Sequence, residues 1–183
     1  KPQLNNSNIL GNSVSIPYYK ILEENKDFTI TPTLFDDNFF MLENEFRQIN
    51  KNSNLEVNFG IVNGYKSSTV SKKKNINSIF SEFNQDLNLE NFISSNLYLS
   101  LQRMNNDTFL KVFDQNIQDI KLKPKDPSIL ESKAKISLDH NEYNLEGGLT
   151  VYENLEKASS DRYQYILPYF NFNKKLSNNF LNG

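Results

Sequence analysis

The stretch that decides the fold reads Phe28-Thr29-Ile30-Thr31-Pro32-Thr33-Leu34. Its apolar side chains alternate with threonines, so in an extended chain the two kinds lie on opposite faces. A strand of this type separates two environments. A protein core against water is typical of a β-sandwich, whereas lipid against a wet lumen is typical of an outer-membrane barrel.

The same period-two alternation recurs along most of the chain, while helical periodicity is poor. It predicts strands near residues 27–36, 38–50, 54–63, 78–89, 95–104, 129–139, 142–152 and 162–173. Most are about the 9–11 residues that a tilted membrane-spanning strand needs. The predicted fold class is therefore all-β, an antiparallel up-and-down meander of about eight strands curved into one layer, part of a large outer-membrane β-barrel.

Composition excludes several classes of protein. Twenty basic and 22 acidic residues among 183 leave a net charge of -2. The chain therefore lacks the excess of basic residues that is typical of nucleic-acid-binding proteins. The chain has no cysteine, so disulfide and thiolate chemistry are excluded. No apolar run reaches the length of about 18 residues that a membrane-spanning helix requires. We expect a polar N-terminal lead over residues 1–12 and the strands over residues 13–183.

Catalytic signals are sparse. His140 is the only histidine and adjoins Asn141, a combination typical of a turn. Glu43, Glu45 and Arg47 alternate on one strand face, where they are either paired carboxylates for acid–base work or the solvated wall of a lumen. The second interpretation is favoured, and we expect no catalytic residue, no cofactor and no metal site.

Two prolines interrupt strand-like segments. Proline has no backbone N–H, so within sheets it is restricted to edges, strand starts and bulges. Pro17 and Pro32 therefore either protect an edge strand from aggregation or weaken a seam that has to open.

Three segments in order resemble the opening of a known barrel domain: Ser15-Ile16-Pro17-Tyr18-Tyr19, Asp27-Phe28-Thr29-Ile30-Thr31-Pro32 and Glu43-Asn44-Glu45-Phe46-Arg47. They are similar to the LptD family, the outer-membrane lipopolysaccharide-assembly proteins. Residues 101–110 and 163–168 look like later segments of that family. The chain departs from the family pattern at Lys20 and Gln48, where the family has Trp and Tyr.

The resemblance implies a function. Proteins of this family insert lipopolysaccharide into the outer leaflet of the bacterial outer membrane through a lateral gate. The implied partners are lipopolysaccharide, outer-membrane lipids, a plug lipoprotein and periplasmic transport-bridge proteins. By this resemblance residues 13–183 are the first barrel strands, and Pro17 and Pro32 belong to the gate strand. The expected lumen-facing polar residues are Thr29, Thr31, Thr33, Glu43, Glu45 and Arg47.

The alternative is a soluble β-sandwich that binds a ligand or partner; an enzyme on a β scaffold is not favoured by these residues. The two folds place the apolar faces differently. A sandwich would enclose Phe28, Leu55, Leu97 and Leu149 in a common core, whereas a barrel would point them outward from a single layer.

Overall fold

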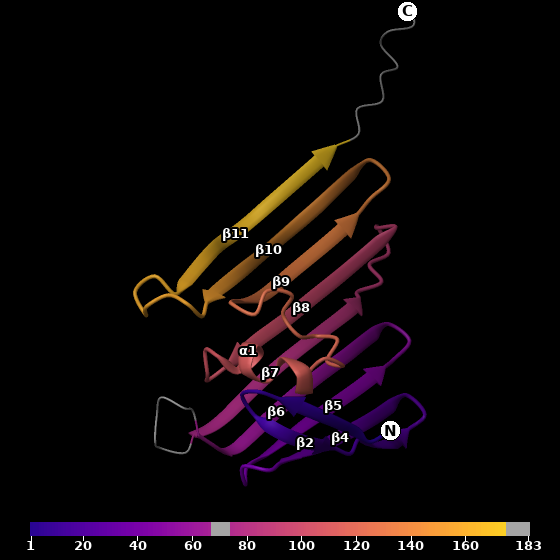
Figure 1. The fold of residues 1–183 in the computed structure, drawn as a ribbon. Coiled ribbons are helices and arrows are strands. Elements are labelled where there is room, and N and C mark those ends of the chain that lie inside the picture. The colour runs from indigo at the N-terminus through magenta and orange to yellow at the C-terminus, as the bar shows by residue number, and fades with distance from the viewer. Residues whose placement is uncertain (67–73, 175–183) are drawn as a thin grey trace, which may run out of the picture.

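The computed structural model describes residues 1–66 and 74–174, which form one antiparallel sheet (Figure 1). Its eleven strands are β1 (Gln3–Ser7), β2 (Gly11–Ser15), β3 (Tyr18–Glu23), β4 (Lys26–Phe35), β5 (Phe40–Ile49), β6 (Ser53–Tyr65), β7 (Lys74–Asp86), β8 (Ser94–Met104), β9 (Ile129–Asp139), β10 (Tyr143–Asn154) and β11 (Tyr163–Lys174). From β4 onward each strand pairs with its neighbours in sequence, so the all-β meander prediction is confirmed. Within the described ranges the sheet does not close into a barrel.

The predicted number of about eight strands is wrong, because three more lie at the N-terminus. One of them, β1, falls inside residues 1–12, which were expected to be a polar lead. The sequence of β1 has no apolar alternation, and its hairpin with β2 depends on polar contacts and on a left-handed residue instead. Asn6 donates a side-chain hydrogen bond to Asn12 over 2.6 Å, and Gly11 adopts a φ of 72°.

Strands β2 and β3 are two halves of one interrupted strand. Ser15 pairs with Thr33 of β4, and Tyr18 pairs with Ile30, so both halves follow the same register on β4. The interruption lies at residues 16–17, and β1 flanks only the β2 half.

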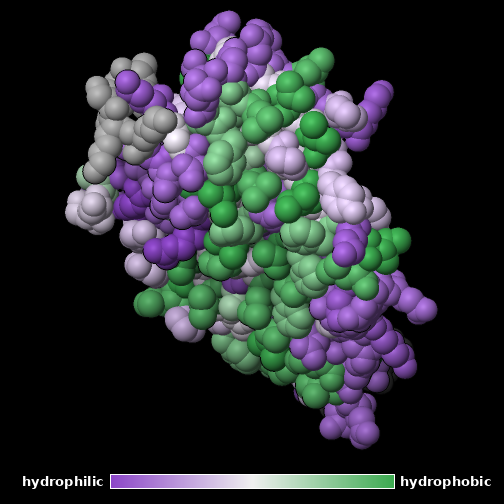
Figure 2. Space-filling view, turned by 90° about the horizontal axis from the view of Figure 1, so that it is seen from below, coloured by the Kyte–Doolittle hydropathy of each residue, from purple (hydrophilic) through white to green (hydrophobic). Residues whose placement is uncertain are grey.

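The two faces of the sheet differ sharply in chemistry. We call the face covered by residues 105–128 the inner face and the opposite one the outer face. Direct cross-strand neighbours on the inner face form the row Asp27, Arg47, Glu56, Glu82, Ser100, Lys133 and Thr150. A parallel row on the outer face is Leu55, Phe83, Leu99, Ala134 and Leu149. Seen from below, hydrophobic side chains gather in a broad band between hydrophilic margins (Figure 2).

Residues 105–128, which we call the cover segment, pack against one end of the inner face. The segment contains the short helix α1 (Phe109–Val112) and a 3-10 turn η1 (Asp114–Asn116). Phe113 is fully buried and meets Phe35, Phe39 and Tyr65 edge to face at ring-centroid distances of 5.4–6.3 Å. A stretch that reads as a long polar loop therefore supplies part of the hydrophobic core.

The sandwich alternative finds no support in the packing of the described residues. Their buried hydrophobic cluster contains none of Phe28, Leu55, Leu97 and Leu149. Leu149 is 43% exposed on the outer face, and the other three are half-buried in the single layer. No helix in residues 1–66 or 74–174 is long and apolar enough to cross a membrane.

Candidate functional site

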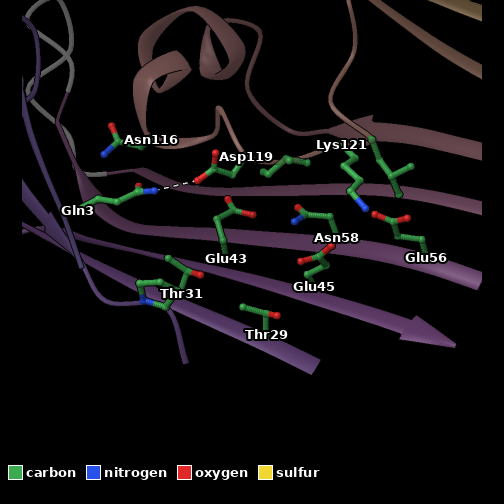
Figure 3. Close-up of a pocket in the computed structure, with 13 residues that line it drawn as sticks. Gln3, Thr29, Thr31, Glu43, Glu45, Glu56, Asn58, Asn116, Asp119 and Lys121 are labelled. Carbon is green, nitrogen blue, oxygen red and sulfur yellow. Dashed lines mark hydrogen bonds between the residues drawn. The ribbon is translucent and has the colours of Figure 1, made fainter. Parts of the chain in front are cut away.

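The inner face carries a small polar cavity of about 90 Å³ between β4–β6 and the cover segment (Figure 3). Five of the residues expected at a functional site line it: Pro17, Thr29, Thr31, Glu43 and Glu45. Strand alternation explains this gathering, because in registered strands every second residue faces the same side. Thr29 lies opposite Glu45, and Thr31 lies opposite Glu43.

The other two expected polar residues share the same face but lie outside the cavity. Thr33 is buried, and its hydroxyl shares a 2.7 Å hydrogen bond with the hydroxyl of Ser15 on β2. Arg47 donates to Asp27 over 2.9 Å and lies 3.8 Å from a carboxylate oxygen of Glu45. All six polar residues expected to face the lumen are thus on the inner face.

The interpretation of Glu43, Glu45 and Arg47 as a uniformly solvated wall requires one correction. Glu45 and Arg47 are partly exposed, but Glu43 is only 7% exposed. The cover segment is the physical reason, since it passes above the β5 end that carries Glu43. No local pattern could place a segment more than sixty residues away over this side chain.

Hydrogen bonds from the N-terminal strands fix the roof of the cavity. The side-chain amide of Gln3 donates to Asp119 over 2.9 Å, as drawn in Figure 3, and Asn116 donates to the hydroxyl of Ser13 over 3.1 Å. β1 and β2 therefore hold the cover segment in addition to extending the sheet. Sequence reasoning missed these contacts because Gln3 and Asp119 are separated by 116 positions.

Glu43 has unusual surroundings at the floor of the cavity. Its direct neighbour on β6 is Gly60, which in turn lies opposite Ser78 on β7. A Cβ atom at position 60 would lie 2.3 Å from Glu43 Oε1 and 2.5 Å from Ser78 Oγ, so glycine leaves the space that these two side chains share. Among the described residues, both Glu43 oxygens, Asn58 Oδ1 and Ser78 Oγ are buried without a hydrogen-bond partner.

The two prolines occupy different positions relative to the seam between β4 and the β2–β3 strand. Pro32 lies within β4, and its carbonyl accepts a hydrogen bond from the Ile16 amide, so its nitrogen also faces that seam. Pro17 follows Ile16, so its nitrogen faces away from β4. Only Pro32 therefore directs its missing donor into the seam with β4, because successive residues direct their backbone groups to opposite sides. The gate role expected for Pro17 stays a prediction.

Ion pairs tie the cover segment to the turn between β10 and β11. Arg162 contacts Asp107 and Glu153, each over 2.6 Å, and Lys111 contacts Glu156 over 2.5 Å. The hydrogen bond from Arg162 lowers the pKa of Asp107. The hydrogen bond from Lys111 lowers the pKa of Glu156 in the same way. Asp107 of the cover segment and Glu156 of the β10–β11 turn are thereby both kept ionised.

The remaining motifs have structural roles. His140 lies in the β9–β10 turn, where its Nδ1 accepts a hydrogen bond from the Glu142 amide. Gly148 lies at a register shift between β10 and β11. Within residues 1–66 and 74–174, no group of three or more His, Cys, Asp or Glu side chains could hold a metal ion. The inner face thus offers hydrogen bonds and charge to a polar ligand.

No protein-family model matches this chain, and no curated protein matches it. The function is therefore argued from the motifs of the sequence and from the two faces of the sheet.

Proposed function

We propose that this chain forms the first strands of an LptD-like barrel in the bacterial outer membrane and takes part in inserting lipopolysaccharide into the outer leaflet. The observation that supports the proposal best is the contrast between the two faces of one sheet. A polar row that crosses seven strands lies one residue away from an apolar row that crosses five. A barrel wall between lipid and a wet lumen requires this arrangement.

The outer face is apolar and open to its surroundings. Its large side chains with more than a third of their surface exposed include Leu34, Phe40, Phe59, Leu99, Leu101, Ile136, Leu149, Phe170 and Phe172. Burying one such side chain is worth about 1.5–3 kcal/mol, so a sheet that leaves them in water is strongly disfavoured. A hydrocarbon layer against this face removes that cost.

The inner face suits the passage of a polar headgroup. Threonine hydroxyls on β4 and the charged side chains of β5 offer donors and acceptors to sugar and phosphate groups. The acyl chains of the same molecule would leave sideways toward the outer face, through the seam that Pro32 weakens. Such transport forms and breaks no covalent bond, which agrees with the expectation of no catalytic residue.

The exposed aromatics also fit a bilayer boundary. Tyr18, Tyr19, Tyr163 and Tyr165 are all exposed, so none belongs to the packed core. Tyrosine is favoured at the interface between lipid and water, where its ring and hydroxyl meet different surroundings. Plug lipoprotein and transport-bridge proteins remain the partners that the family resemblance implies.

The membrane assignment is tested with single-tryptophan variants, because the chain has no tryptophan of its own. Phe59→Trp places the probe on the outer face, and Tyr98→Trp places it on the inner face. Each full chain is reconstituted in vesicles whose phospholipids carry bromine atoms on their acyl chains. We expect strong quenching of the probe at position 59 and weak quenching at position 98. Equal quenching at both positions, or none at either, would refute the proposal.

The gate is tested in cells that depend on the full-length protein carrying Pro32→Ala. Surface lipopolysaccharide should fall at matched levels of folded protein, because the substitution restores a hydrogen-bond donor to the seam. Undiminished delivery would leave the barrel assignment intact and remove the gate.

A further inference from the structure

Buried polar side chains on three neighbouring strands gather around Gly60 on the inner face. Glu43 Oε1 and Ser78 Oγ flank the position that a Cβ atom of Gly60 would take, and Asn58 lies two residues along β6 on the same face. Glu43 comes from β5, Asn58 from β6 and Ser78 from β7, and each of these residues is less than 9% exposed. Four of their side-chain atoms lack a hydrogen-bond partner among the described residues: Glu43 Oε1, Glu43 Oε2, Asn58 Oδ1 and Ser78 Oγ. Buried polar atoms are almost always paired, so four unpaired atoms on adjacent strands of one face point to a ligand.

The chemistry of these atoms defines the ligand. The two carboxylate oxygens of Glu43 and the amide oxygen of Asn58 are acceptors, and the hydroxyl of Ser78 can also present a lone pair. A ligand that presents only further acceptors would leave these oxygens without a partner, whereas a cation can accept lone pairs from all of them. A buried carboxylate is stable only when paired with positive charge or protonated, and Glu43 has no ion-pair partner among the described residues.

The surrounding charges favour a cation further. Besides Glu43, the cavity is lined by the carboxylates of Glu45, Glu56 and Asp119 and by a single cationic side chain, that of Lys121. In Figure 3, the Glu43 side chain points from the sheet toward the part of the cover segment that carries Asp119. A low-dielectric cleft lined by one sign of charge concentrates the opposite ion.

We propose that Glu43, Asn58 and Ser78 form a binding site for Ca²⁺ beneath the cover segment. Calcium takes six to eight oxygen ligands in flexible geometry, and carboxylate, amide and water oxygens are its usual ligands. The protein supplies a bidentate carboxylate, an amide oxygen and a hydroxyl, and water completes the shell. With one carboxylate in direct contact, the affinity belongs to the weak class of roughly 10⁻⁴–10⁻³ M.

The glycine at position 60 belongs to the same site. Its missing Cβ atom leaves room for Glu43 Oε1 and Ser78 Oγ to approach from opposite sides. A bound ion would join β5, β6 and β7 beneath residues 116–122 and would stabilise the contact between sheet and cover segment. The proposal does not depend on the membrane assignment, since it concerns the inner face alone.

The test titrates CaCl₂ into the purified full chain in detergent and measures binding by calorimetry, with NaCl of matched ionic strength as the blank. Wild type should bind with a dissociation constant of roughly 10⁻⁴–10⁻³ M. Glu43→Gln should weaken binding at least tenfold. Glu90→Gln, the same change at an exposed turn residue, should leave it unchanged.

A second variant keeps the proposal testable if Glu43→Gln fails to fold. Asn58→Asp adds a carboxylate beside Glu43, so it should lower stability without calcium and tighten calcium binding about tenfold. No binding by wild type up to about 10 mM CaCl₂ would overturn the proposal and identify Glu43 as a buried neutral acid. Equal binding by wild type and Glu43→Gln would also overturn it, because the ion would then lie elsewhere.

Discussion

The backbone amide of Ile16 donates a 3.0 Å hydrogen bond to the carbonyl of Pro32, and Pro32 has no N–H with which to return a bond. In an antiparallel pair two such residues normally exchange both bonds. The seam between β4 and the interrupted β2–β3 strand therefore lacks one rung at this point. Pro17, which follows Ile16, directs its nitrogen away from β4 and therefore leaves this seam unchanged.

Replacing Pro32 with Ala should strengthen this seam. The new N–H can donate to the Ile16 carbonyl, which is worth about 0.5–1.5 kcal/mol. Pro17→Ala is the matched control, because it carries the same entropic change in the unfolded chain without adding a rung. Hydrogen exchange of the amides in residues 13–23 measures the difference. Equal protection in the two variants would contradict the assignment of Pro32 to the seam.

Gly148 and Gly147 should respond very differently to alanine. A Cβ atom at Gly148 would lie 2.8 Å from the backbone oxygen of Ala134, whereas at Gly147 the nearest atom is 3.7 Å away. Gly148→Ala should cost about 1–3 kcal/mol of unfolding free energy, as overpacking against backbone does. Gly147→Ala should be close to neutral. Urea unfolding of both variants checks this, and equal stability would show that β9 can move away at low cost.

Phe113→Ala should release the cover segment while the sheet remains. Removing a fully buried phenylalanine costs about 3–5 kcal/mol, and here the loss falls on contacts between the segment and the inner face. Trypsin should then cleave after Lys121 and Lys125 much faster, with an unchanged β-sheet circular dichroism spectrum. Phe92→Ala, at a turn residue outside this core, is the control. Unchanged cleavage would mean that the segment is held by its ion pairs alone.

The pair of Asp107 and Arg162 predicts a pH effect of known sign. Because the hydrogen bond from Arg162 lowers the pKa of Asp107 in the folded protein, its contribution to stability is complete above the usual aspartate pKa of about 3.9. It is lost as the pH falls through the lowered value. The contribution stays below about 1 kcal/mol because Asp107 is half-exposed.

Thermal unfolding of wild type and Asp107→Asn measures this effect. Wild type should be the more stable protein at pH 7, and the difference should vanish at the acidic end of the series. Asp161→Asn, a change at an exposed residue of the β10–β11 turn, should show no such difference. If wild type and Asp107→Asn still differed in unfolding temperature in strong acid, the ion pair would be excluded as the cause of the difference.

Alternation in the sequence predicts the strands from β4 to β11 well, because each carries enough apolar residues on one face to show a period of two. It also places Thr29, Thr31 and Glu45 on the same face as Glu43. Alternation does not predict the polar hairpin of β1 and β2, because the segment Gln3–Ser7 has no apolar face.

The cover segment and the calcium site escape prediction for a different reason. Phe109, Phe113 and Ile117 follow each other at the four-residue spacing of a helix, a signal that is easily lost in a polar stretch. The burial of Glu43 depends on where that segment packs on the inner face. Contacts between residues that are far apart in sequence decide this, and no single-strand pattern contains them.

The shared register of β2 and β3 has a consequence for how the N-terminal edge comes apart. Every side chain of β3 is exposed and nothing in the described chain pairs with its other side, whereas β2 is flanked by β1 and linked to Asn116 through Ser13. Fraying that begins at Glu23 can run back only as far as the break at residues 16–17. The first half of the β4 backbone can thus be uncovered while the second half stays paired, which makes the edge open in two separate steps.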